Sequence, residues 1–272
     1  MAERVTRFAP SPTGPLHLGH AYAALVAAQR GDRFLLRIED IDPARCTLAF
    51  EAAIYEDLEW LGLKWDTPVL RQADHAQAYA AALEHLYKLG VTYRCTCTRG
   101  DIRTALSAPQ EGAPNGPDGP IYPGTCRGKT GIGAVRLDMG KAMTLLGTGG
   151  FVETGQRAGR HSFDAAHMQG FVGDIVLARR DIGTSYHLSV VVDDAAQAIT
   201  EVTRGEDLFD ATKIHVVLQR LLGLPTPLYH HHRLIRDDQG KRLAKRDDAR
   251  ALAKYRSEGA TPQDIRAMIG LA

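Results

Sequence analysis

Residues 7–20 read Arg-Phe-Ala-Pro-Ser-Pro-Thr-Gly-Pro-Leu-His-Leu-Gly-His, and they connect two segments of different character. The apolar segment Val5–Phe8 predicts a strand, and the alanine-rich segment 21–29 predicts a helix. The prolines and glycine between the two segments favour a loop. We therefore expect a strand, a loop and a helix in succession, with His17 and His20 at the N-terminus of the helix.

The N-terminus of a helix is a natural seat for phosphate, because it presents N–H donors and a partial positive charge. His17 and His20 can also donate to phosphate oxygens, and Gly19 lets a nucleotide lie against the backbone. Read alone, the pattern His-x-Gly-His is just as typical of an ordinary turn with two surface histidines. The flanking residues must decide between the two interpretations.

The composition is that of a globular protein. The chain has 272 residues, 44% of them hydrophobic, which suffices for one large domain or two modest ones. No stretch approaches the roughly 18 apolar residues of a membrane helix, and the first residues lack the apolar core of a signal peptide. We expect a cytoplasmic protein. Because the formal net charge is only +1, any contact with RNA must depend on local basic clusters.

A second strand is predicted at Arg33–Ile38, and the acidic run Glu-Asp-Ile-Asp-Pro follows it at residues 39–43. Carboxylates at the carboxyl end of a parallel strand point into the crevice where open α/β sheets bind ligands. Glu39 could receive an ammonium group there; the alternative is a solvated acidic turn. Helices predicted at residues 48–61 and 73–89 are interpreted as scaffold.

The four cysteines, at positions 46, 95, 97 and 126, do not resemble an extracellular disulfide framework. Cys95 and Cys97 are spaced so that one tetrahedral ion can reach both sulfurs, and Cys126 could supply a third ligand. The stretch 107–124 before it is rich in glycine and proline, so we expect little helix or strand there. The spacing is equally compatible with structural zinc and with reduced cysteines, and Cys46 is one candidate for a fourth ligand.

The second half of the chain alternates predicted strands and helices. Residues 185–194 form the strongest predicted strand, because β-branched residues precede an acidic end. Further strands are expected within 174–181 and 199–208, and an amphipathic helix is expected at 210–222. The three histidines at 230–232 cannot all face one metal ion, because side chains on a strand alternate sides.

A basic stretch, Lys-Arg-Leu-Ala-Lys-Arg-Asp, occupies residues 241–247. A basic loop can close over a triphosphate and stabilise negative charge on departing pyrophosphate. The alternative is a solvated basic patch. Two short helices are expected after it, near residues 249–254 and 262–269.

Three of these motifs together resemble the class I glutamyl- and glutaminyl-tRNA synthetases. Residues 7–20 match the first signature of that family, and Arg-Ile-Glu-Asp-Ile-Asp-Pro at 37–43 matches its acidic strand end. Residues 242–246 resemble the second signature, Lys-Met-Ser-Lys-Ser, with Arg242 in place of the first lysine and Ala244 in place of the first serine. The resemblance implies an α/β fold: a Rossmann-like catalytic domain with an inserted zinc-binding subdomain.

The implied domain organisation has four parts. Residues 1–90 would form the first Rossmann-like half, and residues 91–175 the insertion that carries the zinc site. Residues 176–246 would form the second half with the basic loop, and residues 247–272 a helical C-terminal segment.

The resemblance also implies an ATP-dependent ligase that converts glutamate and ATP to glutamyl-adenylate and pyrophosphate without needing tRNA. His17, His20 and Lys245 would be catalytic, and Mg²⁺ would accompany ATP. A guanidinium suits a carboxylate because it donates two parallel hydrogen bonds, so Arg204 is the expected determinant of glutamate over glutamine. Glutamate would be held by Arg7, Phe8, Ala9, Pro10, Ser11, Glu39, Tyr186 and Arg204, and ATP by His17, Gly19, His20 and Lys245.

Within the family, the chain most resembles the short bacterial paralogues of glutamyl-tRNA synthetase, in which Cys-x-Cys is followed by Tyr-x-x-x-Cys. Tyr122 and Cys126 stand at that spacing, so the resemblance implies one structural Zn²⁺ held by Cys95, Cys97, Tyr122 and Cys126. These paralogues lack an anticodon-binding domain, and we expect the same of this chain. The expected partners are ATP, L-glutamate and a queuosine-containing tRNA(Asp) that is glutamylated on its wobble base, and we expect a monomer.

Three alternatives remain open. The chain could be a truncated glutamyl-tRNA synthetase that charges a tRNA 3′ end, or a catalytically inactive relative that binds tRNA. It could also be a small-molecule adenylyltransferase, which shares His-x-Gly-His but does not predict Glu39 and Arg204.

Overall fold

The computed structural model describes residues 3–98, 100–102, 115–236 and 250–271. Two groups of mainly parallel strands form its centre. The first group is parallel, in the order β1 (Val5–Phe8), β2 (Arg33–Ile38) and β3 (Asp66–Arg71). In the second, β9 alone is antiparallel, and the order is β11 (Glu201–Gly205), β12 (Leu228–His232), β8 (Gly149–Glu153) and β9 (Gly159–Phe163).

The two groups meet between β1 and β11. The N–H of Thr200 donates to the carbonyl oxygen of Val5 at 3.0 Å, and the N–H of Val5 donates to Thr200 Oγ1 at 2.8 Å. From this seam the strand order runs outward to β2 on one side and to β12 on the other. Because successive strands are added in opposite directions on the two sides of this seam, a crevice opens there at the carboxyl ends of the strands. Open α/β sheets bind ligands in such a crevice.

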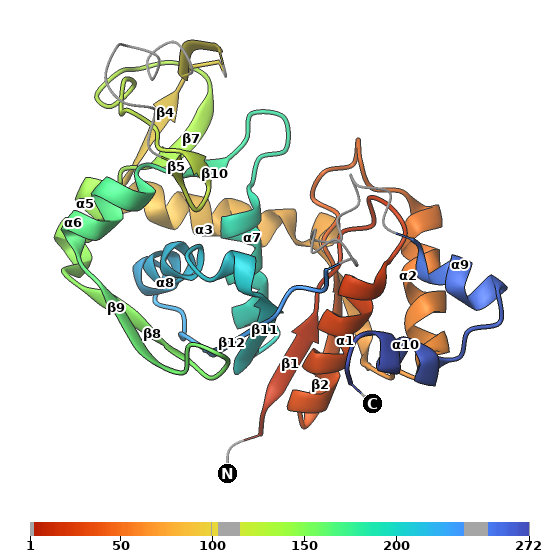
Figure 1. Ribbon diagram of the computed structural model, residues 1–272. Helices are drawn as coiled ribbons and strands as arrows, with labels where there is room; N and C mark the ends of the chain where they lie inside the picture. The colour runs from red at the N-terminus through yellow and green to blue at the C-terminus, as the bar shows by residue number, and fades with distance from the viewer. Residues whose placement is uncertain (1–2, 99, 103–114, 237–249, 272) are drawn as a thin grey trace.

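Helices cover both groups of strands (Figure 1). Around β1 and β2 lie α1 (Leu18–Arg30) and α2 (Leu48–Trp60), with α9 (Leu252–Ser257) and α10 (Pro262–Met268) beside them. These elements share one apolar core, which joins the two ends of the described chain. The other helical segments are η1 (Gln72–His75), α3 (Ala76–Lys88), α5 (Met139–Leu146), α6 (Ala165–His167), η2 (Met168–Val172), α7 (Tyr186–Ala196), η3 (Glu206–Leu208) and α8 (Thr212–Leu221).

A small antiparallel sheet stands at the top of Figure 1, apart from the central strands. Its order is β10 (Val176–Ala178), β7 (Ala134–Leu137) and β4 (Thr92–Cys95), and the two-residue strands β5 (Asn115–Gly116) and β6 (Gly119–Pro120) lie close to it. Within the glycine- and proline-rich stretch, the described residues hold only this short hairpin. Because β8 pairs with β12, part of segment 91–175, which was expected to be the insertion, belongs to the central sheet. The boundaries of the four expected domains stay a prediction.

The strand predicted at residues 185–194 is wrong, because this segment is the helix α7. Ser185 caps it, since its Oγ accepts a hydrogen bond from the N–H of Leu188 at 3.4 Å. Leu188, Val190 and Val191 are all buried. A short helix that is covered on most sides carries the same continuous apolar run as a buried strand, and packing outweighs the small helix penalty of valine.

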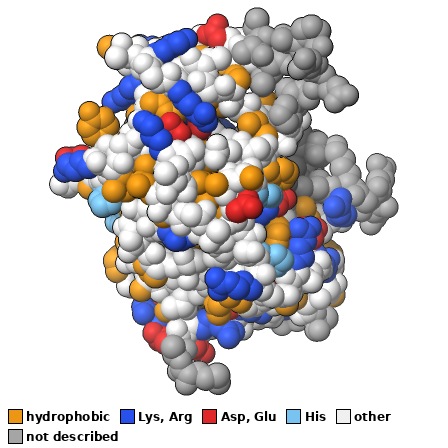
Figure 2. All heavy atoms as spheres, turned by 90° about the vertical axis from the view of Figure 1, so that its left-hand side faces the viewer, with side chains coloured by type: hydrophobic (Ala, Val, Ile, Leu, Met, Phe, Trp, Pro, Cys, Tyr) orange, Lys and Arg blue, Asp and Glu red, His pale blue; other side chains and the backbone are white. Residues whose placement is uncertain are grey.

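The remaining predicted elements are found within a few residues of their expected limits. Every helix in the described ranges is too short or too polar to cross a lipid bilayer. Figure 2 shows the face on the left of Figure 1, where basic, acidic and apolar side chains are interspersed.

Candidate active site

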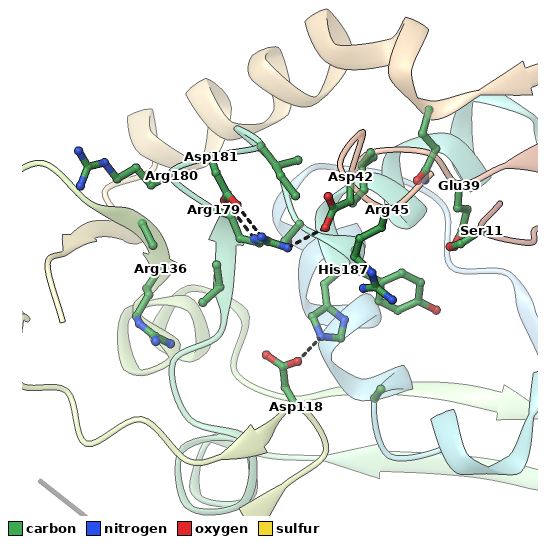
Figure 3. A pocket seen from close by; sticks show the side chains of 18 of the residues that line it. Ser11, Glu39, Asp42, Arg45, Asp118, Arg136, Arg179, Arg180, Asp181 and His187 are labelled. Carbon is green, nitrogen blue, oxygen red and sulfur yellow. Dashed lines mark hydrogen bonds and ion pairs between the residues drawn. The ribbon is translucent and has the colours of Figure 1, made fainter. Parts of the chain in front are cut away.

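A cavity of about 790 Å³ lies between the central strands and the small sheet. Its walls come from the loops after β1 and β2, the N-terminus of α7, the segment between β10 and α7, and the inserted region (Figure 3). Ser11, Glu39 and Tyr186, all expected to contact glutamate, line it. The loops after β1 and β2 are joined directly, because the N–H of Glu39 donates to the carbonyl of Pro10 at 3.0 Å.

Charged side chains dominate the rim of this cavity. In Figure 3, the guanidinium of Arg179 contacts both Asp181 and Asp42, and the imidazole of His187 contacts Asp118. Asp42 belongs to the loop after β2, whereas Arg179 follows β10. This ion pair therefore links the small sheet to the Rossmann-like half.

Arg7 lies on β1, at the seam with β11, and is buried. Its Nε and Nη2 groups donate to the two carboxylate oxygens of Asp194 at 2.8 and 3.3 Å, and its Nη1 donates to the carbonyl of Thr203 at 3.1 Å. Burial by itself would raise the pKa of Asp194, but Arg7 and Arg37 outweigh burial and hold that pKa below its ordinary value. Asp194 is therefore an ionised anchor for Arg7.

Glu39 is held at the carboxyl end of β2 by a neighbour on the same strand. The fully buried Arg37 donates to Glu39 Oε1 at 3.2 Å and to Asp194 Oδ1 at 2.7 Å. Burial raises the pKa of Glu39 above its ordinary value, although Arg37 and Arg7 act against that rise. Asp194 thus connects the two residues, Arg7 and Glu39, that were predicted to hold one substrate.

Arg204, on β11, is buried with three hydrogen-bond partners. Its Nε donates to His231 Nε2 at 3.2 Å, its Nη1 to His215 Nδ1 at 2.8 Å, and its Nη2 to Thr212 Oγ1 at 2.7 Å. None of these partners is acidic, so the guanidinium keeps its positive charge without a directly bound carboxylate among the described residues. This arrangement suits an arginine that receives the carboxylate of a ligand.

His17 and His20 lie at the N-terminus of α1, as predicted, but outside the lining of the cavity. The N–H of Gly19 donates to His17 Nδ1, and the N–H of His17 donates to His20 Nδ1, both at 3.1 Å. A backbone N–H can only donate, so each Nδ1 is an acceptor, and each neutral ring carries its proton on Nε2. The N–H of Gly19 is therefore used within the cap.

Gly19 is required by a close approach. A Cβ atom there would lie 3.0 Å from His17 Cε1 and 3.1 Å from His17 Nδ1. The histidine ring packs against the glycine, so a side chain there would require the ring to shift by a few tenths of an ångström. This contact, rather than the backbone angle, explains the glycine.

Three cysteines form a cluster in the inserted region: the sulfurs of Cys95, Cys97 and Cys126 all lie within 4.8 Å of one another. The hydroxyl of Tyr122 is 3.3 Å from the sulfur of Cys95 and 3.4 Å from that of Cys97. In tetrahedral zinc sites, Zn–S bonds of about 2.3 Å place sulfurs about 3.8 Å apart, so the donor set fits a metal ion. Cys46 lies outside this cluster and contacts the carbonyl of Glu39.

Hydrogen bonding in the cluster favours the thiolate form of Cys126, which is the form that binds a metal ion. Hydrogen bonding from the Tyr122 hydroxyl, above all, lowers the pKa of Cys126 to about 6. Arg136 lies over the ring of Tyr122, with Cζ 3.9 Å from the ring centroid. Because Cys97 also lines the cavity, the cluster supports one of its walls.

The other predicted residues are placed as follows. Phe8 and Pro10 are buried and Ala9 is partly buried, in the strand and loop that lead to Ser11. Lys245, with Arg242 and Ala244, lies outside the described residues. Burial raises the pKa of Tyr186, and the charges of Arg204, Glu39 and Arg7 are near enough to act on it.

Sequence analysis missed the groups that hold these side chains. Asp194 was read as a strand end, and His215, His231 and Glu153 were given no role. A histidine on the buried face of the helix predicted at 210–222 was the one available signal for His215. The other contacts join residues that are far apart in the sequence.

The chain matches a family described as tRNA synthetases class I (E and Q), catalytic domain, over residues 3–120 and 158–272. A protein of Rhodobacter capsulatus named glutamyl-Q tRNA(Asp) synthetase is 62% identical over 98% of this chain and 100% of its own length. A protein of Nocardia farcinica with the same name is 40% identical over 97% of this chain and 82% of its own length.

Solved structures agree on the fold. A glutamate tRNA ligase from Elizabethkingia meningosepticum, in complex with its amino acid, has a TM-score of 0.76 at 26% identity, with 99% of this chain and 61% of that chain covered. The Mycobacterium tuberculosis methionyl-tRNA synthetase shares the fold with a TM-score of 0.64 at 13% identity, covering 98% of this chain and 64% of that chain. The predicted synthetase fold is confirmed. The chain belongs to the glutamyl and glutaminyl branch of the class I tRNA synthetases, a family of ligases.

Proposed function

We propose that this protein activates L-glutamate with ATP and transfers it to the queuosine base at the wobble position of tRNA(Asp). One observation carries the first half: Glu39 and Tyr186 line the cavity, and the buried Arg204 makes its three hydrogen bonds within the described part of the chain to partners that are not acidic. Glutamate has one ammonium and two carboxylate groups; Glu39 supplies an anion and Arg204 a cation, whereas Arg7 is already paired with Asp194. The names of the similar proteins support the choice of queuosine and tRNA(Asp).

Each residue then has a chemical task. Glu39 accepts hydrogen bonds from the ammonium group, and Arg204 donates to the side-chain carboxylate. An oxygen of the α-carboxylate attacks the α-phosphorus of ATP, the bond to the bridging oxygen breaks, and pyrophosphate leaves with those electrons. A hydroxyl of the acceptor next attacks the activated carbonyl and AMP departs.

The nucleotide would lie at the N-terminus of α1. The Nε2–H groups of His17 and His20 can donate to phosphate oxygens, and they stabilise the charge that develops in the transition state. Lys245 is proposed from the sequence to act on the same phosphates. Mg²⁺ bound to ATP would supply further charge neutralisation.

We also propose that the cysteine cluster holds one structural Zn²⁺, with Tyr122 as its fourth ligand. The convergence of three sulfurs and one phenolic oxygen supports this assignment. The ion would fix the segment that carries Cys97, and hence a wall of the cavity, without taking part in the chemistry. We expect the protein to act as a monomer in the cytoplasm.

Transfer of labelled glutamate in the presence of ATP and Mg²⁺ tests the proposal. Three purified acceptors are offered separately: queuosine-containing tRNA(Asp), the same tRNA without queuosine, and tRNA(Glu). We expect label only on the first. Label on tRNA(Glu) alone would support the truncated synthetase instead, and formation of adenylate without transfer to any tRNA would favour a small-molecule adenylyltransferase.

A further inference from the structure

We propose that His215 and His231 are positioning residues, which orient Arg204 for the substrate carboxylate by accepting hydrogen bonds through opposite ring nitrogens. The inference rests on the proposed role of Arg204 in glutamate binding. His215 comes from α8 and His231 from β12, so two elements hold one guanidinium. Both histidines are buried.

The geometry determines which nitrogen of each ring carries the proton. An arginine N–H can only donate, so His231 Nε2 and His215 Nδ1 must both be acceptors. The proton of His231 is then on Nδ1, where it is donated to the carboxylate of Glu153. The proton of His215 is on Nε2, where it is donated to His187 Nδ1 at 3.0 Å.

Each histidine is itself fixed by a second partner. Glu153 is fully enclosed and also accepts the N–H of His231 at 2.9 Å and the N–H of Gly155 at 2.6 Å. Burial and Arg204 lower the pKa of His231 to about 4, and burial lowers the pKa of His215 well below its ordinary value. Both rings are therefore neutral at physiological pH, as an acceptor for arginine must be.

These contacts leave a defined pair of donors. Arg204 has five N–H groups, and its three bonds among the described residues use the Nε hydrogen and one hydrogen on each Nη nitrogen. One N–H remains on each Nη nitrogen. A carboxylate accepts two parallel bonds from such a pair, whereas the amide of glutamine has only one accepting oxygen.

The chain of hydrogen bonds also reaches the cavity. His187, which lines it, places Nε2 at 3.2 Å from Asp118 on the hairpin between β5 and β6 (Figure 3). Because its Nδ1 accepts from His215, its proton is on Nε2 and points to that carboxylate. The inserted region is thus linked through His187 and His215 to Arg204.

Matched substitutions test this assignment. The amide group of asparagine occupies about the place of histidine Nδ1, and that of glutamine about the place of Nε2, so each variant retains one nitrogen's function. His231→Gln and His215→Asn keep the acceptor for Arg204, whereas His231→Asn and His215→Gln remove it. His230, half-buried on the same strand and bonded to Thr154, provides the control with the same two substitutions.

The assay is glutamate-dependent exchange of pyrophosphate into ATP by the full chain, with KM determined for glutamate and for ATP. We expect His231→Asn and His215→Gln to raise KM for glutamate by about 10- to 100-fold, which corresponds to the loss of one hydrogen bond from a charged group, and to reduce discrimination against glutamine. KM for ATP should stay unchanged. His231→Gln and His215→Asn keep the acceptor but lose the second partner of the ring, so they should raise KM for glutamate clearly less than the other replacement at the same position, and both His230 variants should remain within about threefold of the unsubstituted protein.

The decisive result is that glutamine is tolerated better than asparagine at position 231, whereas asparagine is tolerated better than glutamine at position 215. A general loss of packing would rank the two replacements alike at both positions. The same order at both positions, or an unchanged KM in all four variants, would overturn the inference. Glutamate-dependent exchange by the unsubstituted protein is the separate test of the proposed activity. If that exchange is missing, the proposed function fails first.

Discussion

Replacing Asp194 by asparagine tests whether this buried carboxylate organises the proposed glutamate site. Asp194 accepts three hydrogen bonds: two from Arg7 at 2.8 and 3.3 Å, and one from Arg37 at 2.7 Å. Asparagine has nearly the same volume, but it removes the negative charge and turns an amide N–H₂ toward guanidinium donors. Two buried cations would then share fewer acceptors.

The expected loss is large. Removing one partner of a buried ion pair costs about 3–5 kcal/mol, because the remaining charge stays buried without compensation. The total free energy of unfolding of a domain is only about 5–15 kcal/mol. Asp181→Asn is the matched control, because Asp181 makes the same two-point contact with Arg179 while its side chain is 62% exposed. Exposed pairs contribute about 0–1 kcal/mol.

Urea unfolding followed by circular dichroism at neutral pH measures both losses. We expect Asp194→Asn to lose at least about 2 kcal/mol more than Asp181→Asn, which is the smallest difference between the two ranges. Isothermal titration should also show weaker glutamate binding for Asp194→Asn, since this carboxylate holds Arg7 directly and Glu39 through Arg37. Equal losses in the two variants would refute the idea that Asp194 is an ionised anchor.

Other predictions concern the metal, pH and the histidine cap. Cys126→Ser should lose bound zinc by elemental analysis, whereas Cys46→Ser should retain it; zinc retained in the former would contradict the assignment. Because burial raises the pKa of Glu39 above 4.5, KM for glutamate should increase as pH falls through that raised pKa, earlier than for an exposed glutamate. Glu39→Gln should abolish this pH dependence in pyrophosphate exchange. Gly19→Ala should displace the ring of His17 and lower kcat roughly tenfold or more, unlike Gly170→Ala, where a Cβ atom meets no neighbour within 4 Å.

The sequence alone predicted the features that depend on short-range patterns. The strand, loop and helix around His17 and His20, the acidic end of β2 and the Cys95-x-Cys97 pair are local, whereas Tyr122 and Cys126 lie further along the chain and Tyr122 was implied by the family resemblance. Their elements are present in the structure, and the four metal-binding candidates converge. Local propensity failed for α7, because a helix buried on most sides has the same apolar run as a strand.

Only the tertiary structure determined what holds the charged side chains in place. Asp194 meets Arg7 across 187 positions of the chain, and His231 meets Glu153 across 78. Such pairs leave no periodic signal, since each member alone resembles an ordinary polar residue in an amphipathic segment. They form because a buried charge or imidazole is stable only when its hydrogen bonds are satisfied, and the fold decides which distant residue satisfies them.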